Sequence, residues 1–154
     1  MKLGIEWSRP IPLKDASRQN LIYSMDHSKL PLSAGVYIFG RRFGKSFEAL
    51  YVGKATIVRW RVRGQFKNLP LMLHLKNAKM GKKLLLTGRL ISKGGQNKQK
   101  CLTLLERGLI RYFLSEGHDL VNKQGTRLRR HEITSVGAGR IVPSPMFVDR
   151  TKGE

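Results

Sequence analysis

The stretch that decides the fold runs from residue 35 to residue 53 and is GVYIFGRRFGKSFEALYVG. Two runs rich in β-branched and aromatic residues, 36–39 and 49–52, flank a turn-like segment, 40–46, that contains two glycines. This arrangement predicts a β-hairpin. Strict alternation along the two strands would place Tyr37 on one face with Phe39, and Tyr51 on one face with Ala49 and Gly53.

The segments after the hairpin predict helices and one more strand. Thr56 can cap a helix in which apolar side chains recur at every fourth position. The apolar stripe of that helix is formed by Val58, Val62 and Phe66. A second short helix over 69–80, a third strand over 83–92 and a longer helix over 102–113 that ends at Gly117 follow. The predicted fold is therefore α/β, a small three-stranded, largely antiparallel sheet flanked by helices.

Length and composition predict one compact core with two extensions. With 154 residues, 40% of them hydrophobic, the chain can enclose a single core. We expect an N-terminal extension, 1–32, with a short helix near 17–25, a core over 33–123, and a basic C-terminal extension, 124–154, that is partly mobile. Apolar runs are far shorter than the roughly 18 residues of a membrane span, and the N-terminus carries no signal pattern. These features predict a cytoplasmic protein that does not enter a membrane.

Charge is the strongest compositional signal. Thirty Lys and Arg residues stand against ten Asp and Glu residues, which gives a formal net charge of +20 and a sequence pI near 10.9. Such a charge predicts a polyanionic partner, because neutralising phosphates releases counterions. Composition alone leaves a ribosomal-type structural protein and a membrane-surface binder open.

One carboxylate lies alone in a basic region. Glu106 is the only acidic residue between Glu48 and Glu116, and it falls along the apolar stripe of the predicted 102–113 helix. A half-buried carboxylate needs a partner, because desolvation disfavours its charge. The residues leave two partners open, a basic side chain from elsewhere in the fold or a bound cation.

Several short motifs occur in a fixed order along the core. Gly35-Val36-Tyr37 and Tyr51-Val52-Gly53 are followed by Arg61, ten positions after Tyr51, and then by Glu106 and Asn122. This ordered set resembles the GIY-YIG endonuclease family, and its second half is especially similar to the nuclease domain of UvrC-type repair subunits. The resemblance covers about residues 33 to 123.

The resemblance implies a site that hydrolyses a phosphodiester. Tyr37 matches the family's proton acceptor for the attacking water, and Tyr51 would position that water. A phenol with an ordinary pKa of about 10 is rarely ionised at neutral pH, so it needs nearby cations such as Lys54 and Arg61. Arg61 would also contact the scissile phosphate through its planar fork of donors. From packing alone, tyrosines in strands are ordinary half-buried residues.

The resemblance also implies one divalent ion, Mg²⁺ or Mn²⁺, held by Glu106. Asn122 would orient the substrate, although an Asn before Lys123 and Gly125 is also typical of a plain turn. One position departs from the family. Many relatives carry Tyr or His one helical turn beyond the conserved Arg, and this chain has Gln65. Glutamine can orient water or phosphate but exchanges no proton at neutral pH.

The partner implied is DNA, double-stranded or branched, with RNA as an alternative. Polar and basic side chains on the first helix, before the third strand and in the C-terminal extension are candidate contacts. They are Arg59, Arg63, Gln65, Lys76, Lys79, Lys82, Lys83, Arg127, Arg129 and Arg130. Aromatic residues make up only 8% of the chain and do not alternate with the basic residues, so we predict no base-stacking platform for single strands.

Three functions follow from these features. The first is a magnesium-dependent endonuclease. The second is a catalytically weak or inactive DNA- or RNA-binding protein of the same fold, which Gln65 makes credible. The third is a ribosome-associated structural protein, which leaves the ordered Tyr, Arg, Glu and Asn set without an explanation.

Overall fold

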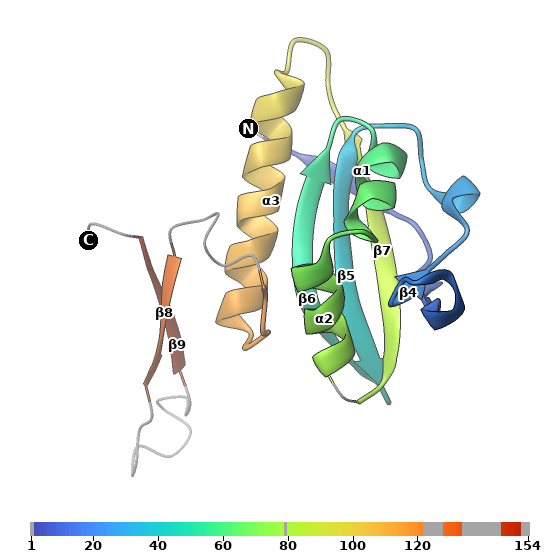
Figure 1. The fold of residues 1–154 in the computed structure, drawn as a ribbon. Helices are drawn as coiled ribbons and strands as arrows, with labels where there is room; N and C mark the ends of the chain where they lie inside the picture. The colour runs from blue at the N-terminus through green and yellow to red at the C-terminus, as the bar shows by residue number, and fades with distance from the viewer. Residues whose placement is uncertain (1, 79, 122–127, 134–145, 152–154) are drawn as a thin grey trace.

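The structure is a computed structural model that describes the backbone of residues 2–78, 80–121, 128–133 and 146–151, and the side chains of the first two ranges. Its centre is a five-stranded sheet in which every pairing is antiparallel. The strands of this sheet are β1 (Gly4–Trp7), β2 (Ile11–Pro12), β5 (Gly35–Phe43), β6 (Ser46–Ala55) and β7 (Lys82–Ile91). Their order is β1-β7-β5-β6, and β2 also pairs with β7 (Figure 1).

Helices cover both faces of this sheet. Helices α1 (Val58–Gln65) and α2 (Leu69–Asn77) lie over one face, while α3 (Lys98–Ser115) runs alongside β6 (Figure 1). The smaller elements are two 3₁₀ turns, Ser17–Gln19 and His27–Lys29, and the paired strands β3 (Lys14–Asp15) with β4 (Tyr23–Ser24) and β8 (Leu128–Ile133) with β9 (Met146–Thr151). No helix in the described part of the chain is both long and apolar enough to cross a membrane.

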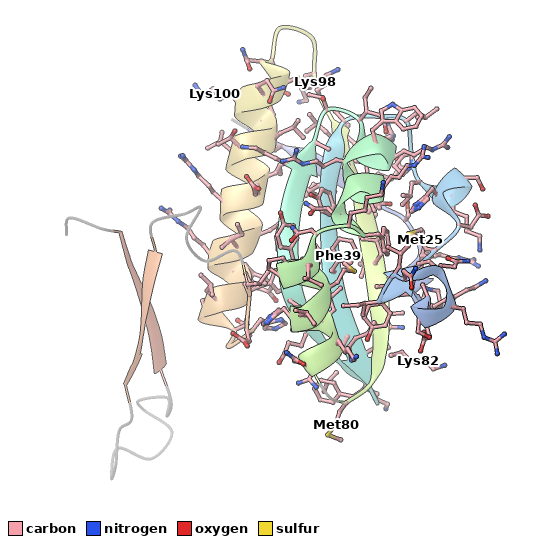
Figure 2. All side chains as sticks on the ribbon, viewed as in Figure 1. Met25, Phe39, Met80, Lys82, Lys98 and Lys100 are labelled. Atoms are coloured by element: carbon pink, nitrogen blue, oxygen red, sulfur yellow. The ribbon has the colours of Figure 1, made fainter. Side chains whose placement is uncertain are left out.

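Each face of the sheet has its own core. Under α1 and α2, Tyr37, Phe39 and Leu85 pack against the helical stripe predicted from the sequence, Val58, Val62 and Phe66. Under α3, Ile38 and Val52 pack against Ile110 and Leu114. Figure 2 shows Met25 and Phe39 inside the first core, whereas Lys82, Lys98 and Lys100 project from the surface. The core to which a strand residue belongs therefore shows on which face of the sheet its side chain lies.

The sheet is larger than the sequence predicted, because the predicted three strands are joined by two from the N-terminal extension. β1 and β2 pair with β7 and so cover the outer edge of that strand, which would otherwise present unpaired backbone groups. The helix predicted near 17–25 is wrong. Asp15 accepts a hydrogen bond from the Ser17 amide (2.8 Å) and Asn20 adopts a left-handed conformation (φ 57°), so the chain turns back and forms the β3–β4 pair.

The remaining predicted elements are confirmed with small shifts. β7 and α2 lie where the pattern placed them, and α3 ends before Gly117, whose φ of +95° is the left-handed region that favours glycine. The Thr56 cap is wrong, because Ile57 occupies the N-cap of α1. The amides of Val58 and Arg59 donate instead to the carbonyls of Ser33 and Pro31, each at 3.0 Å. This contact fixes the 31–33 segment against the start of α1.

A β-bulge corrects the predicted facing of the hairpin. The pairing shifts between Phe39 and Gly40, so that Phe39 lies opposite Tyr51 while Gly40 lies opposite Ala49. Leu50 is the extra residue, and both Leu50 and Tyr51 pack on the α1 side whereas Ala49 packs on the α3 side. Tyr51 and Ala49 therefore do not share a face.

Candidate active site

The two glycines of the paired tripeptides are required by close packing. A Cβ atom on Gly53 would overlap the ring and hydroxyl of Tyr37, which lies directly across the β5–β6 pair. A Cβ atom on Gly35 would overlap the backbone carbonyl of Gly88 on β7. Because only glycine leaves this space open, the Tyr37 ring lies flat over β6 beside Tyr51.

Tyr37, Tyr51 and Gln65 form one hydrogen-bond network. The Nε2 of Gln65 donates to the hydroxyl oxygen of Tyr37 at 2.7 Å and to that of Tyr51 at 3.2 Å. The two rings stack with centroids 6.0 Å apart and planes 23° apart. The Oε1 of Gln65 accepts from Asn68 Nδ2 at 3.0 Å, and Asn68 in turn caps α2 by accepting from the Leu71 amide. The amide of Gln65 is therefore held at both ends.

Burial makes Tyr37 hard to ionise. The Tyr37 side chain is only 1% exposed, and this burial raises its pKa well above the ordinary value. Tyr51 raises the pKa of Tyr37 further, whereas the hydrogen bond from Gln65 and the positive charge of Arg61 lower it. Arg61 thus lies within electrostatic reach of Tyr37. At neutral pH we therefore expect Tyr37 to be a neutral phenol.

Lys54 and Glu106 of the site lie on the other side of β6, toward α3. Lys54 pairs with Val36 across the β5–β6 ladder, and its side chain reaches α3. Lys54 Nζ lies 3.2 Å from Glu106 Oε2 and donates to Thr103 Oγ1 at 2.9 Å. The Lys54 and Glu106 side chains are 33% and 22% exposed. Of the two partners that the sequence left open for Glu106, the structure contains the basic side chain.

A cavity of about 480 Å³ lies at the end of β6. It is lined by residues from the end of β6, the start of α1 and the start of α3, namely Lys54, Ala55, Thr56, Ile57, Trp60, Arg61, Gln99 and Leu102. Lys54 belongs to the charged pair with Glu106, and Arg61 acts on Tyr37. Both cations therefore face one cavity that a phosphate group can enter.

Glu106 fits a metal site in which the protein supplies a single carboxylate ligand. Within the part of the chain that the structure describes, no group of three or more His, Cys, Asp or Glu side chains is placed to hold an ion. A Mg²⁺ ion often takes one or two carboxylates from the protein and completes its shell with water and substrate phosphates. The donor set here fits that arrangement, with Glu106 as the protein ligand once it exchanges Lys54 for the ion.

Some of the candidate DNA contacts form hydrogen bonds within the fold, and others are exposed on the surface. Arg59 donates to the carbonyls of Leu30 (2.9 Å) and Ser28 (3.1 Å), and Lys83 donates to the carbonyl of Ala78. Gln65 is buried in the tyrosine network. Arg63, Lys76 and Lys82 are exposed, and, beside the hydrogen bonds from Ser17, the charge of Lys76 helps to lower the pKa of the Asp15 carboxyl. Lys79, Asn122 and Arg127 lie outside the described residues, as do the side chains of Arg129 and Arg130 in β8.

Three residues of the site were missed by sequence reasoning. Thr103 lies one helical turn before Glu106, so helical spacing could have identified it. Asn68 is a plain N-cap signal whose second role, holding Gln65, depends on tertiary structure. Trp60 lies beside Arg61 in the sequence, yet its side chain is 55% exposed at the cavity.

Comparison of the chain with protein-family models, with curated proteins and with solved structures gives no significant match.

Proposed function

We propose that this protein is a metal-dependent endonuclease that hydrolyses DNA phosphodiester bonds by a one-metal mechanism of the GIY-YIG type. One observation carries the proposal. Residues far apart in the sequence gather around β6: Tyr51 and Tyr37 share a hydrogen-bond network, Lys54 pairs with Glu106, and Lys54 and Arg61 line one cavity. These are the residue types that phosphodiester hydrolysis needs: donors for a phosphate, a group to manage the proton of water and a carboxylate.

In this mechanism the cavity receives the scissile phosphate. Arg61 presents its guanidinium fork to the phosphoryl oxygens and stabilises the charge that grows on them. Lys54, which lines the same cavity, adds a second positive charge. A magnesium or manganese ion, held by Glu106, would supply further charge stabilisation at the phosphate and the leaving oxygen.

The tyrosine network handles the proton. Gln65 donates to both phenol oxygens and so fixes their positions. Tyr37 can accept a proton only as a phenolate, and its raised pKa means that this requires strong positive charge nearby. Arg61 already acts in that direction. Tyr51, which is only half-buried, orients the attacking water from the more open end of the network.

The test is cleavage of plasmid DNA in Mg²⁺ by the parent protein and by Glu106→Gln, with Glu116→Gln as a matched control on an exposed carboxylate. We expect the parent and the control to cut the plasmid and Glu106→Gln to be inactive. DNA affinity of Glu106→Gln should be equal or higher, because a negative charge is lost and Lys54 is released toward phosphate. Full activity in Glu106→Gln would refute the metal assignment.

A second candidate is a DNA- or RNA-binding protein of the same fold with weak or lost cleavage. The tyrosine network favours it, because Gln65 stands where many members of the family that the chain resembles carry Tyr or His, and because Tyr37 is buried with a raised pKa. If the parent protein binds nucleic acid but cuts nothing in Mg²⁺ or Mn²⁺, this second function is the correct one.

A further inference from the structure

Trp60 lies on the exposed face of α1 and takes no part in the hydrophobic core. Its side chain is 55% exposed, while the buried face of α1 is made by Val58, Val62 and Gln65. Burying an indole is more favourable than burying a leucine side chain, because the indole has more surface to remove from water. An exposed tryptophan is therefore a stronger indication of a binding site than a single exposed leucine. Trp60 also lines the cavity that holds Lys54 and Arg61.

The surroundings of Trp60 combine apolar surface with positive charge. Ile57, which lines the same cavity, is 38% exposed. Leu32 is 58% exposed and lies on the 31–33 segment that hydrogen-bonds to the first turn of α1. Lys54 and Arg61 supply two cations next to this apolar mouth.

An aromatic ring beside two cations is complementary to a single nucleotide, which has a base and a phosphate. The π-face of a base stacks on an indole whatever the base, and the attached phosphate pairs with Lys or Arg. The cavity of about 480 Å³ also lies within the range of roughly 300–1,000 Å³ that is typical of small-molecule sites. A base can reach an aromatic face in this way only when it is unstacked from its neighbours.

We propose that Trp60 stacks on an unpaired base next to the phosphate bound by Lys54 and Arg61, so that the preferred partner is DNA with an unpaired or extruded nucleotide. The phosphate is the scissile one only if the proposed nuclease function holds, and in this respect the inference rests on that function. The base contact itself requires no cleavage. It also revises the sequence prediction that no base-stacking platform exists.

The first test measures binding in EDTA, where no cleavage can occur. Two duplexes of about 25 base pairs are compared, one fully paired and one with a single central unpaired nucleotide. The parent should prefer the second duplex, and Trp60→Ala should bind that duplex about 5- to 150-fold more weakly, the range expected for one stacked base. Trp60→Phe should retain part of the preference.

Tyr112→Ala is the matched control, because Tyr112 is an aromatic residue that is 57% exposed on α3 and does not line the cavity. This variant should bind both duplexes as the parent does. If Trp60→Ala also keeps the parent's preference, the inference is wrong, and the exposed indole serves a protein contact instead. Because metal is absent, an inactive nuclease would not change either result.

Fluorescence gives a second, direct readout. The chain has two tryptophans, so Trp7→Phe leaves Trp60 as the sole indole emitter. Stacking on a base should quench its emission on addition of the duplex with the unpaired nucleotide, and the fully paired duplex should quench it much less. Equal emission with both duplexes, despite measured binding, would overturn the proposal.

Discussion

The two sides of strand β6 carry polar groups of opposite kinds. On the α1 side, three neutral side chains share two hydrogen bonds, one of them buried, and glycine packing fixes the position of the Tyr37 ring. On the α3 side, Lys54 and Glu106 form an ion pair that stays in contact with water. Burial therefore separates a rigid neutral network from an open charged pair across a single strand.

This difference predicts which side would change partners if the proposed nuclease bound its substrate. Breaking a buried, hydrogen-bonded network leaves unsatisfied groups and costs about 1–3 kcal/mol for each. A partly exposed ion pair contributes only about 0–1 kcal/mol, because water and salt screen it. Lys54 can therefore move to a phosphate, and Glu106 to a cation, at little cost, while the tyrosines keep their geometry.

The largest expected effect comes from removing the Tyr37 hydroxyl. Tyr37→Phe should lower the cleavage rate at saturating DNA by about 100-fold or more, the scale for losing a group that manages a proton. It should also destabilise the fold by about 1–3 kcal/mol, because one hydrogen of the Gln65 amide loses its buried acceptor. Single-turnover rates and urea unfolding measure the two effects separately.

Tyr51→Phe is the natural comparison, because Tyr51 is half-buried and its hydrogen bond from Gln65 is longer. It should cost less stability than Tyr37→Phe. If Tyr37→Phe binds and cleaves like the parent, Tyr37 is only a packing residue. A rise of the cleavage rate with pH that is unchanged in Tyr37→Phe would likewise show that another group accepts the proton.

The next effect is steric and tests why the second tripeptide ends in glycine. Gly53→Ala forces the buried Tyr37 ring to move, and we expect a loss of about 1–3 kcal/mol in the free energy of unfolding, as for other overpacked cores. Cleavage should fall with it, since the hydroxyl moves away from Gln65. Urea denaturation and a plasmid assay measure both.

Gly64→Ala is the control for that substitution. No described atom outside its own helix lies within 4 Å of a Cβ atom at this position, so alanine should stabilise α1 by up to about 1 kcal/mol. Equal stability of Gly53→Ala and the parent would mean that the tyrosine side of β6 is not rigid.

Sequence reasoning predicted the elements whose signal is local. The hairpin, the stripe from Val58 to Phe66 and the end of α3 at Gly117 each follow from periodicity or from one residue's backbone preference. It missed β1 and β2, because short edge strands are stabilised by β7 and not by their own pattern. The bulge at Leu50 is equally invisible, since one extra residue leaves no mark in composition.

The candidate site shows the same division. Tyr37 and Tyr51 became candidates through the family resemblance, and Glu106 through its isolation among basic residues. Their partners come from other elements, so the bridge through Gln65 and the ion pair with Lys54 could not be predicted. Arg59 is the clearest case. Its position on α1 made it a candidate phosphate contact, and only the tertiary fold shows that it binds the carbonyls of Leu30 and Ser28.

A smaller effect separates Arg59 from Arg63, two cations on the same helix. Arg59→Ala should lower stability by about 1 kcal/mol, because two backbone carbonyls lose a charged donor. Its effect on DNA binding should be slight. Arg63→Ala should leave stability unchanged and reduce the slope of log Kd against log salt by about 0.9, the value for one phosphate contact. If both variants reduce the slope equally relative to the parent, Arg59 leaves its carbonyls to bind DNA.

The smallest expected effect lies on the charged side of β6. A double-mutant cycle with Lys54→Met and Glu106→Gln, measured by urea unfolding without divalent metal, should give a coupling of about 0.2–1 kcal/mol that shrinks as salt is added. Thr103→Val provides the neighbouring control, because it removes a hydrogen bond from Lys54 and no charge. Weak coupling means that the carboxylate is held loosely enough to accept a cation. A coupling of about 3 kcal/mol or more, insensitive to salt, would instead identify a committed structural pair, and Glu106 could then serve as a metal ligand only at the expense of the fold.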